Sequence, residues 1–471
     1  MKKIKTFLFT TLALVSIVNV SAQSKKKQSK NQDKPNIIFI LADDLGIGNV
    51  GCYGADNFKT PNIDQLAKEG IQFNHTFTAP LCGPSRALIM TGRYAYRTGA
   101  TNQDATGQMK PEVEVMIPKI LKSAGYVTTC VGKWGQLPLG PAEFGFDDYL
   151  RFYGSGVYWY NGEKKIPYKE NGEDKLLSSN EYMPDLMHNH LMKFISDNKK
   201  KPFYAYYSLS HVHGEIVATP DTKSEVQEPL SLYTDNINYM DKLVGKLIHS
   251  LDSLHLREKT MIVFMGDNGT AGNWYTKSTI NGKILSGKKG EMKECGGLVP
   301  MLINWPSVVA PQNPSGQLID ASDFVPTLAE IAGAKLPSGI TLDGKSFANQ
   351  IMGKNGPQRD WIFVELGNKW YVRDNQWKLN NNNELFDMTN APFEEKLIDD
   401  SNKTPESTAA FKKLSGILTQ LNPAGGILDN GDGSGRHGNK SKKKKEGKDK
   451  EEKNKDDKDK EGKKKSEKEE E

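Results

Sequence analysis

The segment Asn36-Ile37-Ile38-Phe39-Ile40-Leu41-Ala42-Asp43-Asp44 decides the fold, because an unbroken apolar run ends there in two carboxylates. A run of this length is typical of a β-strand whose two faces are both covered. Two later segments, residues 202–209 and 260–265, have a similar apolar and aromatic composition, and each leads into polar residues. We therefore predict three buried strands with acids or histidines at their carboxyl ends.

Amphipathic helical patterns accompany these predicted strands along the chain. They lie at residues 63–70, 117–124, 185–195 and 237–251. Strands that alternate with helices form a mostly parallel sheet with helices on both faces, and such sheets bind ligands beyond the carboxyl ends of their strands. We therefore predict an α/β fold, with a large and mostly parallel sheet sandwiched by helices.

The pattern of long apolar strands and amphipathic helices ends around residues 339–347. Short segments of β-like composition follow, and a helical pattern at residues 406–421 closes this part of the chain; the segments are residues 361–366, 369–373, 377–379 and 384–387. Turn residues separate them, as in an antiparallel sheet. We therefore predict a main domain at residues 35–340 and a smaller C-terminal α+β subdomain with an antiparallel sheet at residues 341–425.

The two ends of the chain differ in composition from the rest. Residues 1–22 have a lysine-rich start, an apolar centre and a small-residue end, which is the pattern of a secretory signal peptide, and residues 23–34 form a basic linker. Residues 426–471 are rich in glycine and then in lysine and acids, so we expect a disordered tail. No apolar run is long enough to span a membrane. We expect an exported protein, periplasmic or secreted, without a membrane span.

The formal net charge of +5 comes from the lysines at these two ends. Residues 35–438, which contain the predicted folded part, are mildly acidic. Proteins that bind nucleic acids through their surface carry a basic patch or stripe there. The composition therefore argues against nucleic acid as a partner.

Two pairs of hard oxygen ligands follow two of the predicted strands. Asp43 and Asp44 follow the first strand, and Asp267 and Asn268 follow the third. A single acidic pair at such a position is often only a helix cap, but one parallel sheet can bring both strand ends together. Three carboxylates and an amide carbonyl suit Ca²⁺, or alternatively Mg²⁺, better than a soft metal. The sequence therefore predicts a divalent-cation site.

Residues 82–93, CGPSRALIMTGR, lie between the two pairs in the chain. Pro84 suits the first turn of a helix, which would place Cys82 just before a helix N-terminus, where unpaired N–H groups favour an anion. Arg86, one turn further on, can bind two oxygens of a sulfate or phosphate at once. The alternative for Cys82 is a small buried apolar residue, as most single cysteines are.

This segment, with CGPSR at residues 82–86 and TGR at residues 91–93, resembles the signature of the type I, formylglycine-dependent sulfatases of the alkaline-phosphatase-like superfamily. The resemblance extends over residues 35 to about 425. It implies that a maturation enzyme oxidises Cys82 to formylglycine (3-oxoalanine), whose hydrated aldehyde is the nucleophile and also a metal ligand. It further implies hydrolysis of sulfate monoesters, on a sulfated carbohydrate or another small sulfate ester, by a catalytic domain at residues 35–340.

The resemblance also implies the remaining site residues. Together with Arg86, Lys133 and Lys289 occupy sulfate-binding positions, and Lys289 or His213 would protonate the departing alcohol. Many members of the family have a histidine two residues after the motif lysine, whereas this chain has glycine there, followed by Gln136. Gln136 is therefore a candidate to replace that histidine by hydrogen bonding, although it cannot act as a base.

Two of these assignments involve a choice between neighbours. His213 is preferred to His211, because the run to residues 219–221 then keeps the spacing of the family. Lys289 is preferred to Lys288, because the glycine that follows it and the later Val299-Pro300 align with it.

Other interpretations remain open at this stage. A phosphomonoester or phosphodiester hydrolase of the same superfamily is the main alternative, and a catalytically silent glycan-binding relative is a third. An aromatic stretch could stack on a sugar, although such stretches more often pack in a core; it comprises Tyr149, Phe152, Tyr153, Tyr158, Trp159 and Tyr160. Among the other cysteines, Cys52, Cys130 and Cys295, one disulfide is possible in an exported protein.

Overall fold

The computed structural model describes residues 34–159 and 166–427. The predicted signal peptide, the linker up to residue 33 and the tail from residue 428 lie outside the described residues. Within those ranges, no helix is long and apolar enough to cross a membrane. All four cysteines are present as free thiols, so the optional disulfide is not formed.

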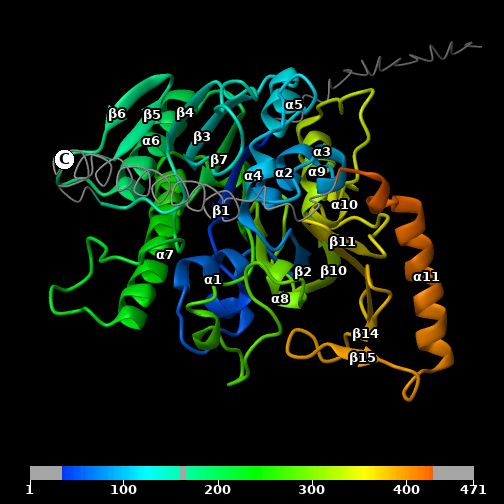
Figure 1. The fold of residues 1–471 in the computed structure, drawn as a ribbon. Helices are drawn as coiled ribbons and strands as arrows, with labels where there is room; N and C mark the ends of the chain where they lie inside the picture. The colour runs from blue at the N-terminus through cyan, green and yellow to red at the C-terminus, as the bar shows by residue number, and fades with distance from the viewer. Residues whose placement is uncertain (1–33, 160–165, 428–471) are drawn as a thin grey trace, which may run out of the picture. The chain divides into compact units, whose positions relative to one another are not determined.

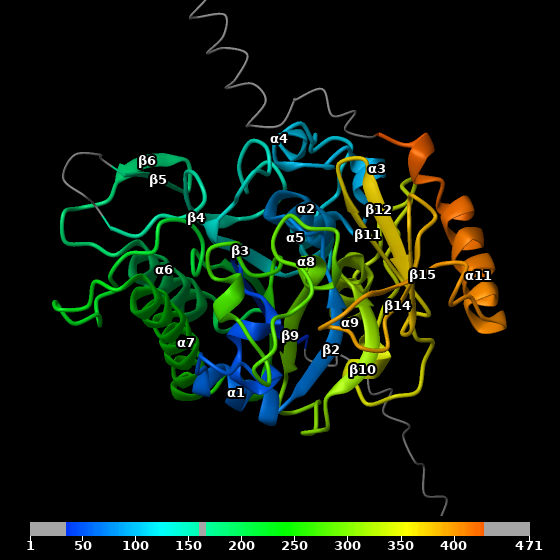
Figure 2. The ribbon, with the colours of Figure 1, turned by 60° about the horizontal axis from the view of Figure 1, so that its bottom comes forward.

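A ten-stranded sheet forms the centre of the described part (Figures 1 and 2). In spatial order its strands are β10 (Ser315–Asp320), β2 (Ile71–Phe77), β9 (Leu298–Asn304), β8 (Thr260–Gly266), β1 (Asn36–Ala42), β7 (Phe203–Ser208), β3 (Val127–Lys133), β4 (Asp148–Phe152), β5 (Pro167–Glu170) and β6 (Glu173–Leu176). All of them except β9 and β5 run in one direction. The predicted fold class is therefore confirmed, and the three strands predicted from the sequence are β1, β7 and β8.

Helices cover both faces of this sheet, as the alternation of side chains along β1 requires. Ile37, Phe39 and Leu41 pack with residues of α2 (Cys82–Thr91), α5 (Ile117–Ser123) and α9 (Phe324–Ala332). Ile38 and Ile40 pack on the other side with residues of α1 (Pro61–Lys68), α6 (Met183–Asn198) and α7 (Pro229–Ser253). Each fully buried side chain of this size contributes about 1.5–3 kcal/mol, which fixes β1 in the centre of the sheet.

Short elements connect these layers. The short α-helices are α3 (Ala95–Thr98), α4 (Gln103–Thr106), α8 (Glu294–Gly297) and α10 (Ala348–Ile351). Turns of 3-10 helix lie at Ile47–Asn49, Gly51–Tyr53, Arg257–Lys259, Tyr275–Lys277, Ala321–Asp323 and Pro423–Gly425. Of these elements, α4 packs against α2 and α8 packs against β9.

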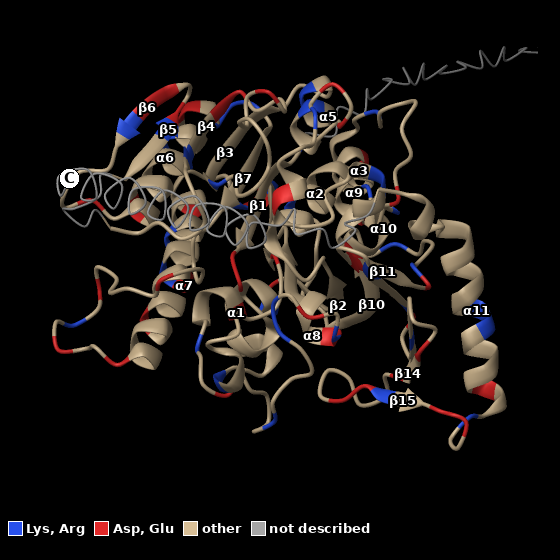
Figure 3. Ribbon diagram, in the orientation of Figure 1, with Lys and Arg blue, Asp and Glu red and all other residues tan. Residues whose placement is uncertain are grey.

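The C-terminal part forms a separate five-stranded antiparallel sheet, as predicted, with one strand more than the sequence suggested. Its strands are β11 (Ile362–Leu366), β12 (Lys369–Arg373), β13 (Trp377–Asn380), β14 (Leu385–Asp387) and β15 (Lys396–Ile398). Helix α11 (Pro405–Leu421) packs Leu414 against Val372 and Leu379 of this sheet. A buried ion pair between Arg373 and Glu294 joins β12 to α8. Basic and acidic residues are interspersed along the ribbon (Figure 3).

Candidate active site

The two predicted pairs of oxygen ligands meet at one edge of the sheet. Strands β1 and β8 are parallel neighbours whose last residues, Ala42 and Gly266, lie opposite each other. The backbone N–H of Asp267 donates to the carbonyl of Ala42 at 3.0 Å, and the N–H of Asp44 donates to Asp267 Oδ1 at 3.1 Å. Parallel pairing alone therefore brings together acids that are more than 200 residues apart in the chain.

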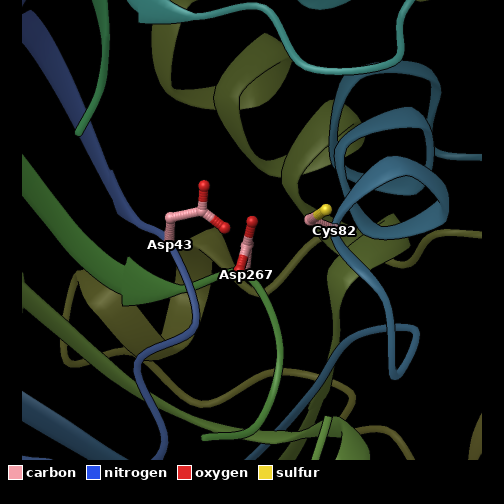
Figure 4. A group of neighbouring side chains, drawn as sticks. All are labelled: Asp43, Cys82 and Asp267. Carbon is pink, nitrogen blue, oxygen red and sulfur yellow. The ribbon is translucent and has the colours of Figure 1, made fainter. Parts of the chain in front are cut away.

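Cys82 lies beside these acids. It is the first residue of α2, whereas the sequence analysis placed it just before the start of a helix. Its sulfur and one carboxylate oxygen each from Asp43 and Asp267 lie within 4.8 Å of one another. Figure 4 shows the two carboxylates next to each other at their strand ends, with Cys82 on the neighbouring helix. Burial raises the pKa of the Cys82 thiol, so the unmodified side chain is a neutral thiol at neutral pH.

Arg86, one turn further along α2, is completely buried against the same acids. Its Nη2 donates to Asp267 Oδ2 at 2.7 Å, and its Nη1 donates to Ser208 Oγ at the end of β7. Burial by itself opposes the charge, but the Tyr206 hydroxyl and the carboxylates of Asp267 and Asp43 outweigh it and raise the pKa of Arg86. The guanidinium is therefore held as a fixed positive charge.

Lys133 ends β3 and pairs with Asp43 in a buried ion pair. Gly132 precedes it with a φ of +107°, and a Cβ there would lie 2.0 Å from the carbonyl oxygen of Ser208, so this position requires glycine. Burial raises the pKa of Asp43, but the charges of Lys133, His213 and Arg86 outweigh it and hold that pKa below its usual value. Asp43 is therefore ionised.

Asp44 contacts the other two predicted basic residues. Lys289 Nζ lies 2.7 Å from Asp44 Oδ1, and His213 Nε2 lies 3.9 Å from Asp44 Oδ2. His211 is fully buried, and its Nε2 is hydrogen-bonded to the Tyr182 hydroxyl at 3.0 Å. Burial lowers the pKa of His211 to about 3, so it remains neutral. Of the two histidines, His213 is therefore the one beside the acids.

Two glutamines, Gln136 and Gln103, differ in their contacts. Within the described residues, the Gln136 side chain makes no hydrogen bond. Gln103 of α4, which the sequence analysis did not single out, donates from Nε2 to Cys82 Sγ at 3.0 Å and accepts the N–H of Gly83 at 2.6 Å. No motif or spacing marks Gln103, because a chain turn of about twenty residues brings it back to α2.

One member of the aromatic stretch, Tyr158, contacts the segment that contains His211 and His213. The Tyr158 hydroxyl is buried and donates to the backbone carbonyls of Ser210, at 3.0 Å, and His213, at 2.9 Å. Tyr149 and Phe152 are buried as well, whereas Tyr153 is 40% exposed beside Arg151. Tyr160 lies outside the described residues. The buried members of the stretch therefore pack inside the molecule, as such stretches usually do.

Two oxygens at the strand ends are free to accept further contacts. Asp43 Oδ1 and Asn268 Oδ1 are buried and accept no hydrogen bond from any described residue, although Asn268 donates from Nδ2 to Asp44 at 2.9 Å. In the part of the chain that the structure describes, two groups of side chains could hold a metal ion, namely Asp43 with Cys82 and Asp267, and Asp43 with Asp44 and His213. A buried acceptor without a donor is costly, so unpaired oxygens here fit a bound cation.

Comparison with known proteins agrees with this geometry. The Sulfatase family model matches residues 35–334. The chain is 27% identical to the N-acetylgalactosamine-6-O-sulfatase of Bacteroides thetaiotaomicron, over 80% of this chain and 88% of that protein. It is 32% identical to the human N-acetylgalactosamine-6-sulfatase, over 66% of this chain and 64% of that protein.

A solved structure shares the architecture. The crystal structure of Ps i-CgsB superposes with a TM-score of 0.72 at 30% identity, over 82% of this chain and 92% of that one. The family match covers the sheet, helix α2 and the acids at the strand ends, and both relatives are sulfatases. The chain therefore belongs to the sulfatase family, within the alkaline-phosphatase-like superfamily, and is a sulfuric ester hydrolase.

Proposed function

We propose that the protein hydrolyses sulfate monoesters on a sulfated carbohydrate, with Cys82 as the position of the nucleophile. The observation that carries this proposal is the convergence of Cys82, Asp43 and Asp267 within 4.8 Å. The names of the relatives support a sugar substrate, since one acts on N-acetylgalactosamine 6-sulfate groups and Ps i-CgsB has been solved in complex with k-i-k-neocarrahexaose.

The acids at the strand ends fit a divalent cation. Asp43, Asp44, Asp267 and Asn268 offer hard oxygen ligands of the kind that Ca²⁺ prefers and Mg²⁺ also accepts, and two of these oxygens are buried without a hydrogen-bond partner. When bound, such a cation would polarise the sulfate group. The protein would hold it with Asp43, Asp44, Asp267, Asn268 and the side chain at position 82.

The nucleophile fits formylglycine at position 82. The family signature around Cys82 supports its oxidation by a maturation enzyme, which is then a required partner. Formylglycine supplies a hydrated aldehyde as an oxygen nucleophile. The fully buried position of Cys82 at the first turn of α2 holds that group at the free N–H end of the helix, where negative charge is stabilised.

The basic side chains around position 82 bind the anionic sulfate group. Arg86 and Lys133 are completely buried and Lys289 is largely so, so their charges act in a site of low dielectric constant, where electrostatic stabilisation of a sulfate ester is strong. His213 or Lys289 would give a proton to the departing sugar oxygen, since both lie at the more exposed side of the cluster. Gln136 stays a candidate for a supporting hydrogen bond.

Two further points complete the proposal. The lysine-rich and apolar start of the sequence supports export, to the periplasm or outside the cell.

A phosphomonoester or phosphodiester hydrolase is the alternative, because a cation and three basic residues would also bind a phosphate ester. The family match favours the sulfate ester.

Paired assays test the proposal. The full-length protein from a host with the maturation enzyme is assayed on p-nitrophenyl sulfate, p-nitrophenyl phosphate and monosulfated sugars, and the peptide across Cys82 is weighed by mass spectrometry. We expect sulfate release and a mass at Cys82 that corresponds to the aldehyde. Phosphate release with no sulfate release, or an unchanged thiol in an active preparation, would refute the proposal.

A further inference from the structure

A groove of basic and amide side chains begins beside the site and continues onto the C-terminal sheet. It consists of two adjoining cavities, of about 520 Å³ and about 460 Å³. They share Met292, Lys293, Asn368 and Lys369. One wall is the segment before α8, and the other is the turn between β11 and β12. We call it the lysine groove.

Both walls of the lysine groove connect directly to the site. On one wall, Gly290 follows Lys289, and its N–H donates to the carbonyl of Pro80 at 2.7 Å, two residues before Cys82. On the other wall, the N–H of Gly367 donates to the carbonyl of Thr101 at 2.7 Å, two residues before Gln103. A ligand whose reacting group lies at Cys82 would therefore have the opening of the groove close by.

The groove is positively charged. Among the described residues, Lys293 and Lys369 are exposed and form no ion pair. The acids that line the groove are already neutralised, since Glu291 lies 3.7 Å from Lys288 and Glu395 pairs with the buried Lys378. The two shared lysines therefore leave an uncompensated charge of the sign that attracts an anionic ligand.

The groove also offers groups suited to a sugar chain. Trp370 lines it and is half-buried, so part of its ring is accessible to a sugar face. The side-chain amides of Asn368 and Asn382 make no hydrogen bond within the described residues, and amides can both donate to and accept from hydroxyl or sulfate groups. The combined volume is within the range of ligand sites.

We propose that the lysine groove binds the continuation of a polyanionic glycan, and that Lys293 and Lys369 contact a second anionic group, sulfate or carboxylate, on that chain. This inference rests on the proposed function, because it takes the reacting sulfate to lie at Cys82. The substrate is then a sulfated oligosaccharide or polysaccharide that extends beyond one sugar. An isolated monosulfated sugar would occupy the site and leave the groove unused.

Binding measurements test the groove separately from hydrolysis. The full chain with Cys82→Ala is titrated by calorimetry with sulfated hexasaccharides prepared from carrageenan and from chondroitin sulfate, and with the same hexasaccharides after chemical desulfation. Lys293→Ala and Lys369→Ala are combined in this background, and Lys412→Ala, an exposed lysine of α11, is the matched control.

We expect at least one sulfated hexasaccharide to bind, and the double variant to weaken it about 10-fold or more, since each lost charge-assisted contact weakens binding several-fold. The effect should shrink at high salt, and Lys412→Ala should bind as the parent does. Three results would overturn the proposed role of the lysine groove: unchanged binding in the double variant, equal binding of desulfated hexasaccharides, or no binding by the parent. Failure of the wild type to release sulfate from p-nitrophenyl sulfate would instead count against the proposed function.

Discussion

The side-chain amide of Gln103 lies against Cys82, with Nε2 3.0 Å from Sγ. The same amide accepts the N–H of Gly83 at 2.6 Å. A Cβ at position 83 would lie 2.3 Å from Gln103 Oε1, so glycine at this position leaves the space that Gln103 occupies. Gln103 is thus anchored at both ends of its amide group, and among the described residues it is the glutamine that contacts Cys82, the proposed position of the nucleophile.

Replacing Gln103 should impair the reaction more than replacing Gln136. We expect Gln103→Ala to lower kcat about 10- to 100-fold on p-nitrophenyl sulfate, because loss of a hydrogen bond that orients a reacting group costs on the order of 1–3 kcal/mol. Gln103→Glu keeps the shape but adds an anion beside the sulfate site, so it should be at least as harmful. Steady-state kinetics measures both effects, and mass analysis confirms that position 82 is still oxidised.

Gln136→Ala is the matched comparison, since the Gln136 side chain makes no hydrogen bond within the described residues. A change of less than about 3-fold is expected for a side chain without such a contact. If Gln136→Ala loses more activity than Gln103→Ala, then Gln136 is the residue that replaces the histidine common in the family, and the contact at Cys82 is only structural.

Removal of the divalent cation should abolish activity. We expect dialysis against EDTA to inactivate the enzyme and Ca²⁺ to restore it, and Asp43→Asn to lower kcat/KM about 10²–10³-fold, the range for loss of one strong electrostatic stabiliser. Calorimetry should show Ca²⁺ binding in the wild type and weakened binding in Asp43→Asn. Asp400→Asn, at an exposed position, is the control; full activity of a metal-free enzyme would contradict the assignment.

His213 and Lys289 should separate by their response to the leaving group. If His213 protonates the departing oxygen, His213→Ala lowers kcat about 10²–10⁴-fold on a sulfated sugar, whose alcohol is a poor leaving group, and much less on p-nitrophenyl sulfate. Lys289→Ala should impair both substrates alike, because it removes a charge that binds the anion. The opposite pattern would assign the proton donor to Lys289, and exposed His249 serves as a control position.

Glu365 should make the stability of the protein depend on pH. Its carboxyl is buried, and its Oε1 makes no hydrogen bond with residues 34–159 or 166–427. Burial raises the pKa of Glu365 to about 8. Because the folded-state pKa lies above the unfolded one, the protonated side chain stabilises the fold fully below about pH 4.5, and this stability is lost as the pH rises towards about 8. The loss amounts to roughly 4–5 kcal/mol by pH 9.

Glu365→Gln removes this titration and keeps an acceptor for the N–H of Tyr96, which Glu365 Oε2 binds at 3.0 Å. We expect the variant to be more stable than the wild type at pH 8–9 and similar to it at pH 5, as measured by thermal unfolding. Exposed Glu112→Gln should follow the wild type at every pH. A wild type and a Glu365→Gln variant with parallel pH profiles would show that Glu365 does not titrate in this range.

The sequence predicted the elements that have a strong local signal. The apolar runs of β1, β7 and β8 and the periodic patterns of α1, α5, α6 and α7 identified the central layers. The other seven strands of the central sheet, β2 to β6, β9 and β10, were not predicted. Most of their segments are short or partly polar, whereas the apolar segment of β9 contains Pro300, and pairing with neighbouring strands makes them part of the sheet. Helix α7 also begins earlier than its apolar pattern, because Pro229 and the capping carboxylate of Glu228 start it.

For the site, the sequence by itself determined the candidate residues, because strand ends and the motif around Cys82 are local features that can be recognised without knowledge of the tertiary structure. It preferred His213 to His211 from the spacing of the family, and His213 is the histidine beside Asp44. It did not determine that β1 lies between β8 and β7 or that Gln103 reaches Cys82. These depend on contacts between segments up to more than 200 residues apart, and packing of the whole core selects such contacts. The tertiary structure also decided where a long substrate could lie, since the lysine groove exists only where the C-terminal sheet meets the segment before α8.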